Sequence, residues 1–189
     1  MIHLEIEYKT LLNKDEFNRL TTLLSHIKPV TQTNYYFDTE TFDMKAHRMS
    51  LRIRTYCDRA ELTLKIPKDI GNMEHNHDLT LSEAKNIIKT GQLPDIPLIA
   101  LIRENGVEPK SLKTFGNLTT TRRETLTDIG LMALDHNQYA DIIDYELELE
   151  VTDPEEGKRN FDKFLRKHHI NFKYAKSKVA RFSSTLKKK

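Results

Sequence analysis

Four segments of this 189-residue chain place a charged or polar side chain at every second position, with an apolar residue between. Successive side chains of a β-strand point to opposite faces, so this period of two predicts strands with one apolar and one charged face. The segments cover residues 4–9, 50–56, 61–66 and 141–152. The alternation leaves open whether the charged faces meet water outside a sheet or converge inside a closed barrel.

The rest of the chain supplies further strands and several helices. Aromatic and β-branched residues or renewed alternation predict four more strands, at 30–39, 112–115, 118–126 and 130–135. Apolar residues three and four apart predict helices after Asn13, over 82–91 with Ser82 as cap, over 97–105 and after Asp153. Residues 67–81 are polar and are expected to be irregular. Hairpin-like connections favour a largely antiparallel sheet of about eight strands.

Composition narrows the class of protein. The 30 Lys and Arg residues nearly cancel 28 Asp and Glu residues, for a net charge of +2, which argues against disorder and against a global basic excess for nucleic acid. A single Cys excludes an intrachain disulfide and a Cys-based zinc site. The longest apolar stretch, 96–102, is too short to span a bilayer, and the N-terminus lacks a signal-peptide pattern. We expect one cytoplasmic domain over 1–189, with 184–189 as a frayed basic tail.

The identity of the charged residues carries more information than their spacing. Arg52 and Arg54 share one strand face, and so do Glu146, Glu148 and Glu150. Like charges at this spacing repel unless a counter-charge or a ligand lies between them. Carboxylate rows suit a hard divalent cation, and paired guanidinium groups suit phosphate. The two rows together predict a site for a metal with a polyphosphate.

The motifs in their order resemble the CYTH domain, also called the triphosphate tunnel metalloenzyme family. Glu5-Ile6-Glu7-Tyr8-Lys9 matches the E-x-E-x-K opening of that family. The later segments that look like family strands or motifs are Tyr36-Phe37-Asp38-Thr39, Leu51-Arg52-Ile53-Arg54, Leu62-Thr63-Leu64-Lys65, Thr121-Arg122-Arg123, Leu134-Asp135, Glu146-Leu147-Glu148 and Ser177-Lys178. The resemblance covers nearly the whole chain, and it is to the small stand-alone bacterial members, which are thiamine-triphosphatase-like.

This resemblance implies an α+β fold, an eight-stranded antiparallel β-barrel or tunnel with helices packed outside. It also implies Mg²⁺ or Mn²⁺ as cofactor and a small-molecule triphosphate as substrate. Carried over by position, the metal ligands would be Glu5, Glu7, Asp135, Glu146 and Glu148. The phosphate-binding residues would be Lys9, Arg52, Arg54, Lys65, Arg122 and Lys178. The residues expected to act in catalysis are Glu5, Glu7, Lys9 and Glu148.

The sequence departs from the family pattern at two places. Many members carry a Lys two positions before the Arg that matches Arg122, where this chain has Thr120. Arg123 could replace that phosphate contact, although its parity places it on the other face of the strand. Residues 67–110 match no motif of the family.

The function predicted here is metal-dependent hydrolysis of tripolyphosphate, thiamine triphosphate or a nucleoside triphosphate. Adenylate cyclase chemistry and a non-catalytic polyphosphate or nucleotide receptor are the alternatives, and the acidic rows favour catalysis. An RNA-binding sheet is disfavoured because the charged face carries no aromatic side chains. His75-Asn76-His77 as a metal site, and Lys187–Lys189 as an RNA or membrane contact, are weaker hypotheses than a polar loop and a solvated tail. No membrane partner is expected, and the oligomeric state stays open.

Overall fold

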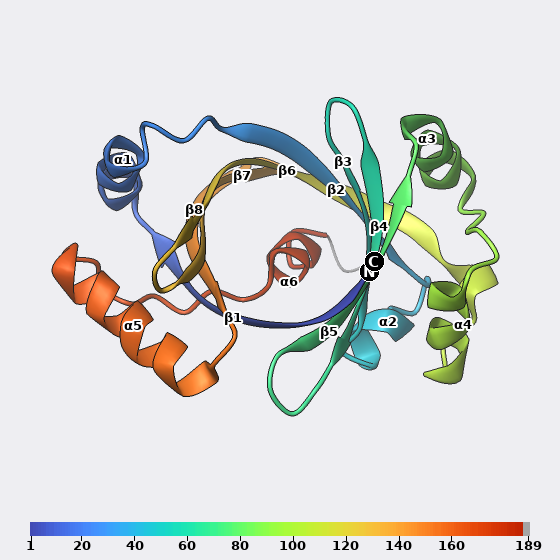
Figure 1. The fold of residues 1–189 in the computed structure, drawn as a ribbon. Coiled ribbons are helices and arrows are strands. Elements are labelled where there is room, and N and C mark those ends of the chain that lie inside the picture. Colours follow the sequence, from blue (N-terminus) through green and yellow to red (C-terminus); the bar gives the residue numbers. More distant parts are fainter. Residues whose placement is uncertain (187–189) are drawn as a thin grey trace. The chain divides into compact units, whose positions relative to one another are not determined.

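A computed structural model describes residues 1–186 and contains eight strands whose hydrogen-bonding order closes on itself as β1-β5-β4-β3-β2-β6-β7-β8. The pairs with an assigned register are antiparallel. The fold is therefore the closed eight-stranded antiparallel barrel that the family resemblance implied. The strands, shown in Figure 1, are β1 (Ile2–Leu12), β2 (Val30–Asp38), β3 (Ser50–Thr55), β4 (Ala60–Pro67), β5 (Asn72–Leu79), β6 (Lys113–Thr127), β7 (Gly130–Tyr139) and β8 (Ile142–Val151).

Six α-helices and one 3₁₀ turn connect and follow these strands within residues 1–186. None of the helices in this part of the chain has the length and apolar character needed to cross a membrane. Their bounds are α1 (Lys14–Leu23), α2 (Asp43–Ala46), α3 (Leu81–Thr90), α4 (Pro97–Glu104), the 3₁₀ turn η1 (Pro109–Ser111), α5 (Pro154–Lys167) and α6 (Lys178–Ser183).

The chain divides into two compact units, which are described separately. The first unit consists of Met1–Leu4 and Gln32–Asn117, and the second of Glu5–Thr31 and Leu118–Lys189. Their boundaries fall inside β1, β2 and β6, so each of these strands contributes residues to both units. Each unit has its own buried apolar cluster.

The second unit packs α1 and α5 on the apolar face of β7 and β8. Leu147 and Leu149 of β8 are fully buried there with Phe161 and Leu165 of α5. Alternation explains the arrangement, because burying the odd-numbered apolar positions of β8 turns Glu146 and Glu148 to the opposite face. Both helices begin where the sequence predicts. Asn13 forms a capping box with Glu16, and the Asp153 side chain accepts a hydrogen bond from the Glu156 backbone.

The first unit packs α3 and α4 against the apolar faces of β3, β4 and β5. Ile53, Leu62 and Leu64 have no exposed surface, whereas Arg52 and Lys65 lie on the other face of the same strands. The turn at 56–59 is a tight hairpin, closed by a hydrogen bond from the Tyr56 backbone N–H to the Arg59 carbonyl. β3 and β4 are therefore joined by one of the hairpin-like connections that the sequence indicated.

Three local predictions were wrong. Residues 72–79 form strand β5 rather than an irregular segment, and 113–127 is one strand rather than two. The expected total of eight strands was right only because these two errors cancel. Helix α3 begins one residue before Ser82, and Thr80 caps it. In the predicted tail, residues 184–186 form turns closed by backbone hydrogen bonds after α6, and Lys187–Lys189 lie outside the described residues.

Candidate metal and phosphate site

The charged face of the second unit is built from neighbouring strands in register. Arg122 of β6 pairs with Asp135 of β7, and Asp135 pairs with Glu146 of β8. Across the other edge of β8, Lys9 of β1 pairs with Glu148. Directly paired residues point to the same face of a sheet, so the register alone brings these acids and bases together.

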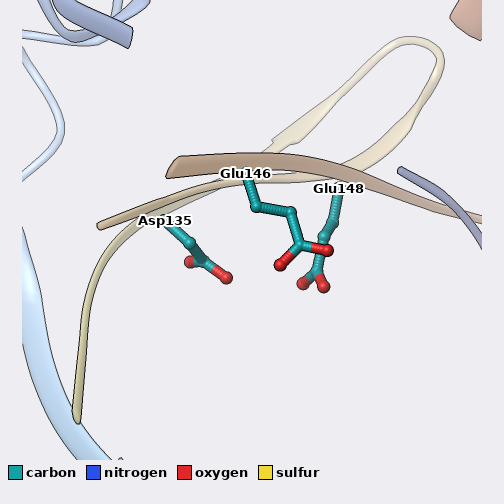
Figure 2. Close-up of side chains that lie close together, drawn as sticks. All are labelled: Asp135, Glu146 and Glu148. Atoms are coloured by element: carbon teal, nitrogen blue, oxygen red, sulfur yellow. The ribbon is translucent and has the colours of Figure 1, made fainter. Parts of the chain in front are cut away.

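Three carboxylates form a compact acidic cluster on this face. One oxygen each from Asp135, Glu146 and Glu148 lies within 4.8 Å of the other two. Asp135 and Glu146 have no exposed surface, and Glu148 is nearly as buried. Figure 2 shows the three side chains leaving β7 and β8 toward the same side. Such a set of close oxygen donors fits a hard divalent cation.

Two buried cations lie among these carboxylates. The Lys178 ammonium is 2.9 Å from Asp135, 3.0 Å from Glu146 and 2.6 Å from Glu148. The Arg122 guanidinium donates two hydrogen bonds of 2.7 Å to Asp135 and one of 2.5 Å to Glu148. Burial lowers the pKa of Lys178, but the carboxylates outweigh it and hold that pKa well above its usual value.

The same interactions act on the acids. Burial raises the pKa of Glu148, but Lys178 and Arg122 outweigh it and hold the pKa well below its usual range. The pKa of Asp135 is lowered in the same way, against the effect of its burial. Asp135 and Glu148 are therefore ionised at neutral pH, as metal binding requires.

Strand β1 adds the residues of the E-x-E-x-K motif. Glu5 is buried, and Glu7 and Lys9 are partly buried and joined to each other by an ion pair. Burial lowers the pKa of Lys9, but Glu7 and Glu148 outweigh it, so the net shift is upward. Glu5 and Glu7 share the charged face by parity, while the compact acidic cluster consists of the other three carboxylates.

A second charged cluster belongs to the first unit. The Lys65 ammonium is 2.6 Å and the nearer Arg52 nitrogen 4.0 Å from the buried Glu74 carboxylate. Burial raises the pKa of Glu74, but Lys65 and Arg52 bring it down to about 2. Arg54 donates to the Asn34 side chain at 2.9 Å. Three of the six basic residues expected to bind phosphate, Arg52, Arg54 and Lys65, thus lie on β3 and β4, each partly buried.

Glu74 and Arg181 are two of the charged residues that sequence reasoning missed. Glu74 lies on β5 opposite Lys65, in the segment expected to be irregular. Arg181 lies on α6 one turn after Lys178 and contacts Glu146. Helical spacing of Lys178 and Arg181 was the available signal for the second residue.

The remaining residues considered from the sequence have structural or surface positions. Thr120 has no exposed surface and donates to the Asn137 side chain at 2.7 Å, and Arg123 donates to the backbone carbonyl of Ile27. Cys57 is exposed in the turn between β3 and β4. His75 and His77 lie on strand β5 rather than in a polar loop, and within residues 1–186 the compact acidic cluster does not include them.

Comparison with known proteins places this geometry in a family. The model of the CYTH domain matches residues 3–183. The Bacillus subtilis protein named "Putative triphosphatase YjbK" is 34% identical over 187 residues, which are 98% of this chain and 97% of that protein.

Solved structures agree with the fold. A Bacillus halodurans protein described as a "putative adenylate cyclase" has a TM-score of 0.90 at 34% identity, covering 96% of this chain and 98% of that one. The Hippeastrum protein HpAC1, described as a "putative adenylyl cyclase" with a dominant triphosphatase activity, has a TM-score of 0.82 at 26% identity and covers 96% of both chains.

Proposed function

Because the chain belongs to the CYTH domain family, we propose that it is an enzyme that hydrolyses triphosphate compounds with a divalent cation, Mg²⁺ or Mn²⁺. The observation that carries the proposal is the buried cluster in which Lys178 and Arg122 lie between three carboxylates. An anion receptor needs only the cations, whereas a metal–triphosphate complex needs both signs of charge. The relatives named for triphosphatase activity support the same conclusion.

The donor set fits the cation that the family implies. Asp135, Glu146 and Glu148 would bind it directly, and Glu5 and Glu7 would contribute directly or through water. When bound, the cation would neutralise phosphate charge and make a coordinated water more acidic. Glu148 would act in catalysis as a ligand of the cation, because its low pKa keeps it ionised, and Lys9 lies opposite it on β1.

The basic residues would bind and align the substrate. In the second unit, Lys9, Arg122 and Lys178 have carboxylates as their present partners, and phosphate oxygens would be equivalent acceptors. In the first unit, Arg52, Arg54 and Lys65 are proposed as phosphate-binding residues by the same reasoning. No covalent nucleophile is required, because phosphoryl transfer depends mainly on positioning and electrostatic stabilisation.

Cyclisation of a nucleoside triphosphate is the second candidate, favoured by the adenylate cyclase descriptions of two similar structures. Cyclisation would use the same residues to bind the triphosphate and would differ from hydrolysis in the attacking group.

We propose that residues 1–189 form one domain, since the family model spans residues of both units. A cytoplasmic location stays a prediction.

A phosphate-release screen tests the proposal. The full chain is offered tripolyphosphate, thiamine triphosphate and ATP with Mg²⁺, with Mn²⁺ and with EDTA, and cyclic AMP is assayed in parallel. We expect metal-dependent phosphate release from at least one triphosphate and its loss in EDTA. Cyclic AMP without phosphate release would establish the second candidate, and neither product from any substrate would refute both.

A further inference from the structure

Arg181 is the second cation that α6 brings to the charged face of the second unit. Its two terminal nitrogens lie 2.6 Å and 3.3 Å from the two carboxylate oxygens of Glu146. Its Nε lies 3.0 Å from Asp144, and a terminal nitrogen also donates to the Lys176 carbonyl at 2.6 Å. Both terminal nitrogens therefore donate hydrogen bonds to protein oxygens, and Nε lies within ion-pair distance of Asp144 without forming a hydrogen bond, in a side chain that is only 9% exposed. Arg122 and Lys178 have carboxylates as the partners named above, whereas Arg181 is also tied to a backbone carbonyl, which suits a residue that holds another side chain.

Asp144 is itself fixed by a buried network. The Asn137 side chain donates to one carboxylate oxygen at 3.0 Å, and the Tyr139 hydroxyl donates to the other at 2.7 Å. Thr120 in turn donates to Asn137 at 2.7 Å, and neither of these two residues has exposed surface. Thr120 thus helps, through Asn137, to hold the partner of Arg181.

Bidentate pairing with an arginine fixes both the position and the plane of a carboxylate. Glu146 is one of the three carboxylates of the acidic cluster, so its plane decides how an oxygen faces a bound cation. We propose that Arg181 is a positioning residue: it orients Glu146 for the divalent cation, and the network through Asp144 orients Arg181. The inference rests on the proposed function only in taking Glu146 as a ligand of that cation.

A charge effect must be separated from a positioning effect. Removing the positive charge of Arg181 alone would favour a nearby cation through Coulomb attraction, whatever happens to the geometry of Glu146. Two changes preserve net charge while removing the bidentate pairing of Arg181 with Glu146. Arg181→Lys keeps the cation but loses bidentate geometry, and the double change Arg181→Gln with Asp144→Asn removes one charge of each sign.

The test titrates Mn²⁺ alone into the metal-free full chain by calorimetry. We expect both charge-conserving variants to bind Mn²⁺ about 10-fold or more weakly than the original chain, as is typical when an outer partner of a metal ligand is lost. Arg159→Lys on α5 is the matched control, because Arg159 is 69% exposed and its 4.0 Å ion pair with Glu155 lies on the surface. It should bind Mn²⁺ unchanged.

Kinetics supply the second readout. At saturating Mn²⁺, Arg181→Lys should leave the KM for tripolyphosphate within about 2-fold and lower kcat, since Arg181 does not touch phosphate. A KM that rises with kcat unchanged would make Arg181 a phosphate contact and overturn the inference, as would unchanged Mn²⁺ affinity in the charge-conserving variants.

Should those variants fail to fold, Tyr139→Phe decides the question. It removes one hydrogen bond to Asp144 and should weaken Mn²⁺ binding about 2- to 5-fold; unchanged affinity there would refute the network. Failure of the proposed function is distinguishable from failure of this inference. If the proposed function fails, the original chain releases no phosphate, while the Mn²⁺ titrations still discriminate the variants.

Discussion

Replacing Lys178 by Met removes the cation that contacts all three carboxylates of the acidic cluster. At an effective dielectric constant of about 20, each contact near 3 Å contributes roughly 5 kcal/mol of Coulomb attraction before desolvation is subtracted. Breaking a buried ion pair by removing one partner costs about 3–5 kcal/mol net, and the 11% exposure of Lys178 places it in that class. For a chain of this length, 1 kcal/mol corresponds to about 2–4 °C, so the melting temperature in EDTA should fall by roughly 6–20 °C.

A divalent cation should restore part of this loss, because it supplies positive charge to the same carboxylates. Differential scanning calorimetry with and without Mn²⁺ measures the effect. We expect Mn²⁺ to raise the melting temperature of Lys178→Met by several degrees more than that of the original chain. Lys158→Met is the control, since Lys158 is 55% exposed and its surface pair with Asp162 contributes at most about 1 kcal/mol. Equal Mn²⁺-induced shifts of the melting temperature in the original chain and in Lys178→Met would refute the reasoning. A Lys178→Met variant that melts like the original chain in EDTA would also refute it.

Two further predictions concern stability away from the site. Burial raises the pKa of Glu16, but hydrogen bonds from Lys173 and the Asn13 backbone outweigh it and lower the pKa. Its contribution to the free energy of unfolding is therefore present above about pH 4.5 and lost as pH falls through the lower folded value; Glu16→Gln should flatten this pH dependence in urea titrations. Gly157→Ala should destabilise by about 1–3 kcal/mol, although alanine usually favours a helix, because the added Cβ would lie 2.5 Å from Val151 Cγ2. A higher denaturation midpoint for that variant would contradict the packing of α5 on β8.

Much of the fold follows from the alternation, and β5 shows where that signal ends. The strand face that carries Lys65 on β4 carries Glu74 and Asn76 on β5, and the opposite face of β5 carries His75 and His77. Both faces are therefore polar in the sequence, and the apolar–polar alternation typical of a strand is not visible. The segment is a strand because β4 offers it a full edge of backbone partners, among them Lys65 opposite Glu74. A pairing of this kind is tertiary information that the segment alone does not hold.

Glu146 and Glu148 could be anticipated because they sit at every second position of one strand, whereas Asp135 came from the family resemblance. Lys178 came from the family resemblance alone, since nothing in a short basic tail indicates which carboxylates it meets. Arg181 and Asp144 escaped notice for the same reason: their roles depend on α6 lying against β8, and that contact is set by the fold. Local patterns indicate which charged residues share a strand face, and packing decides which of these residues come into contact.

In the proposed function, Glu148, Asp135 and Glu146 bind the cation on which triphosphate hydrolysis depends. The direct measurement is the rate of phosphate release from the best substrate of the screen against Mn²⁺ concentration, for the original chain, Glu148→Gln and the surface control Glu155→Gln. We predict a metal-dependent rate in the original chain and in the control, and a rate lower by about 100-fold or more in Glu148→Gln, with its fold retained by circular dichroism. Near-original rates in Glu148→Gln, or full activity of the original chain in EDTA, would contradict the account.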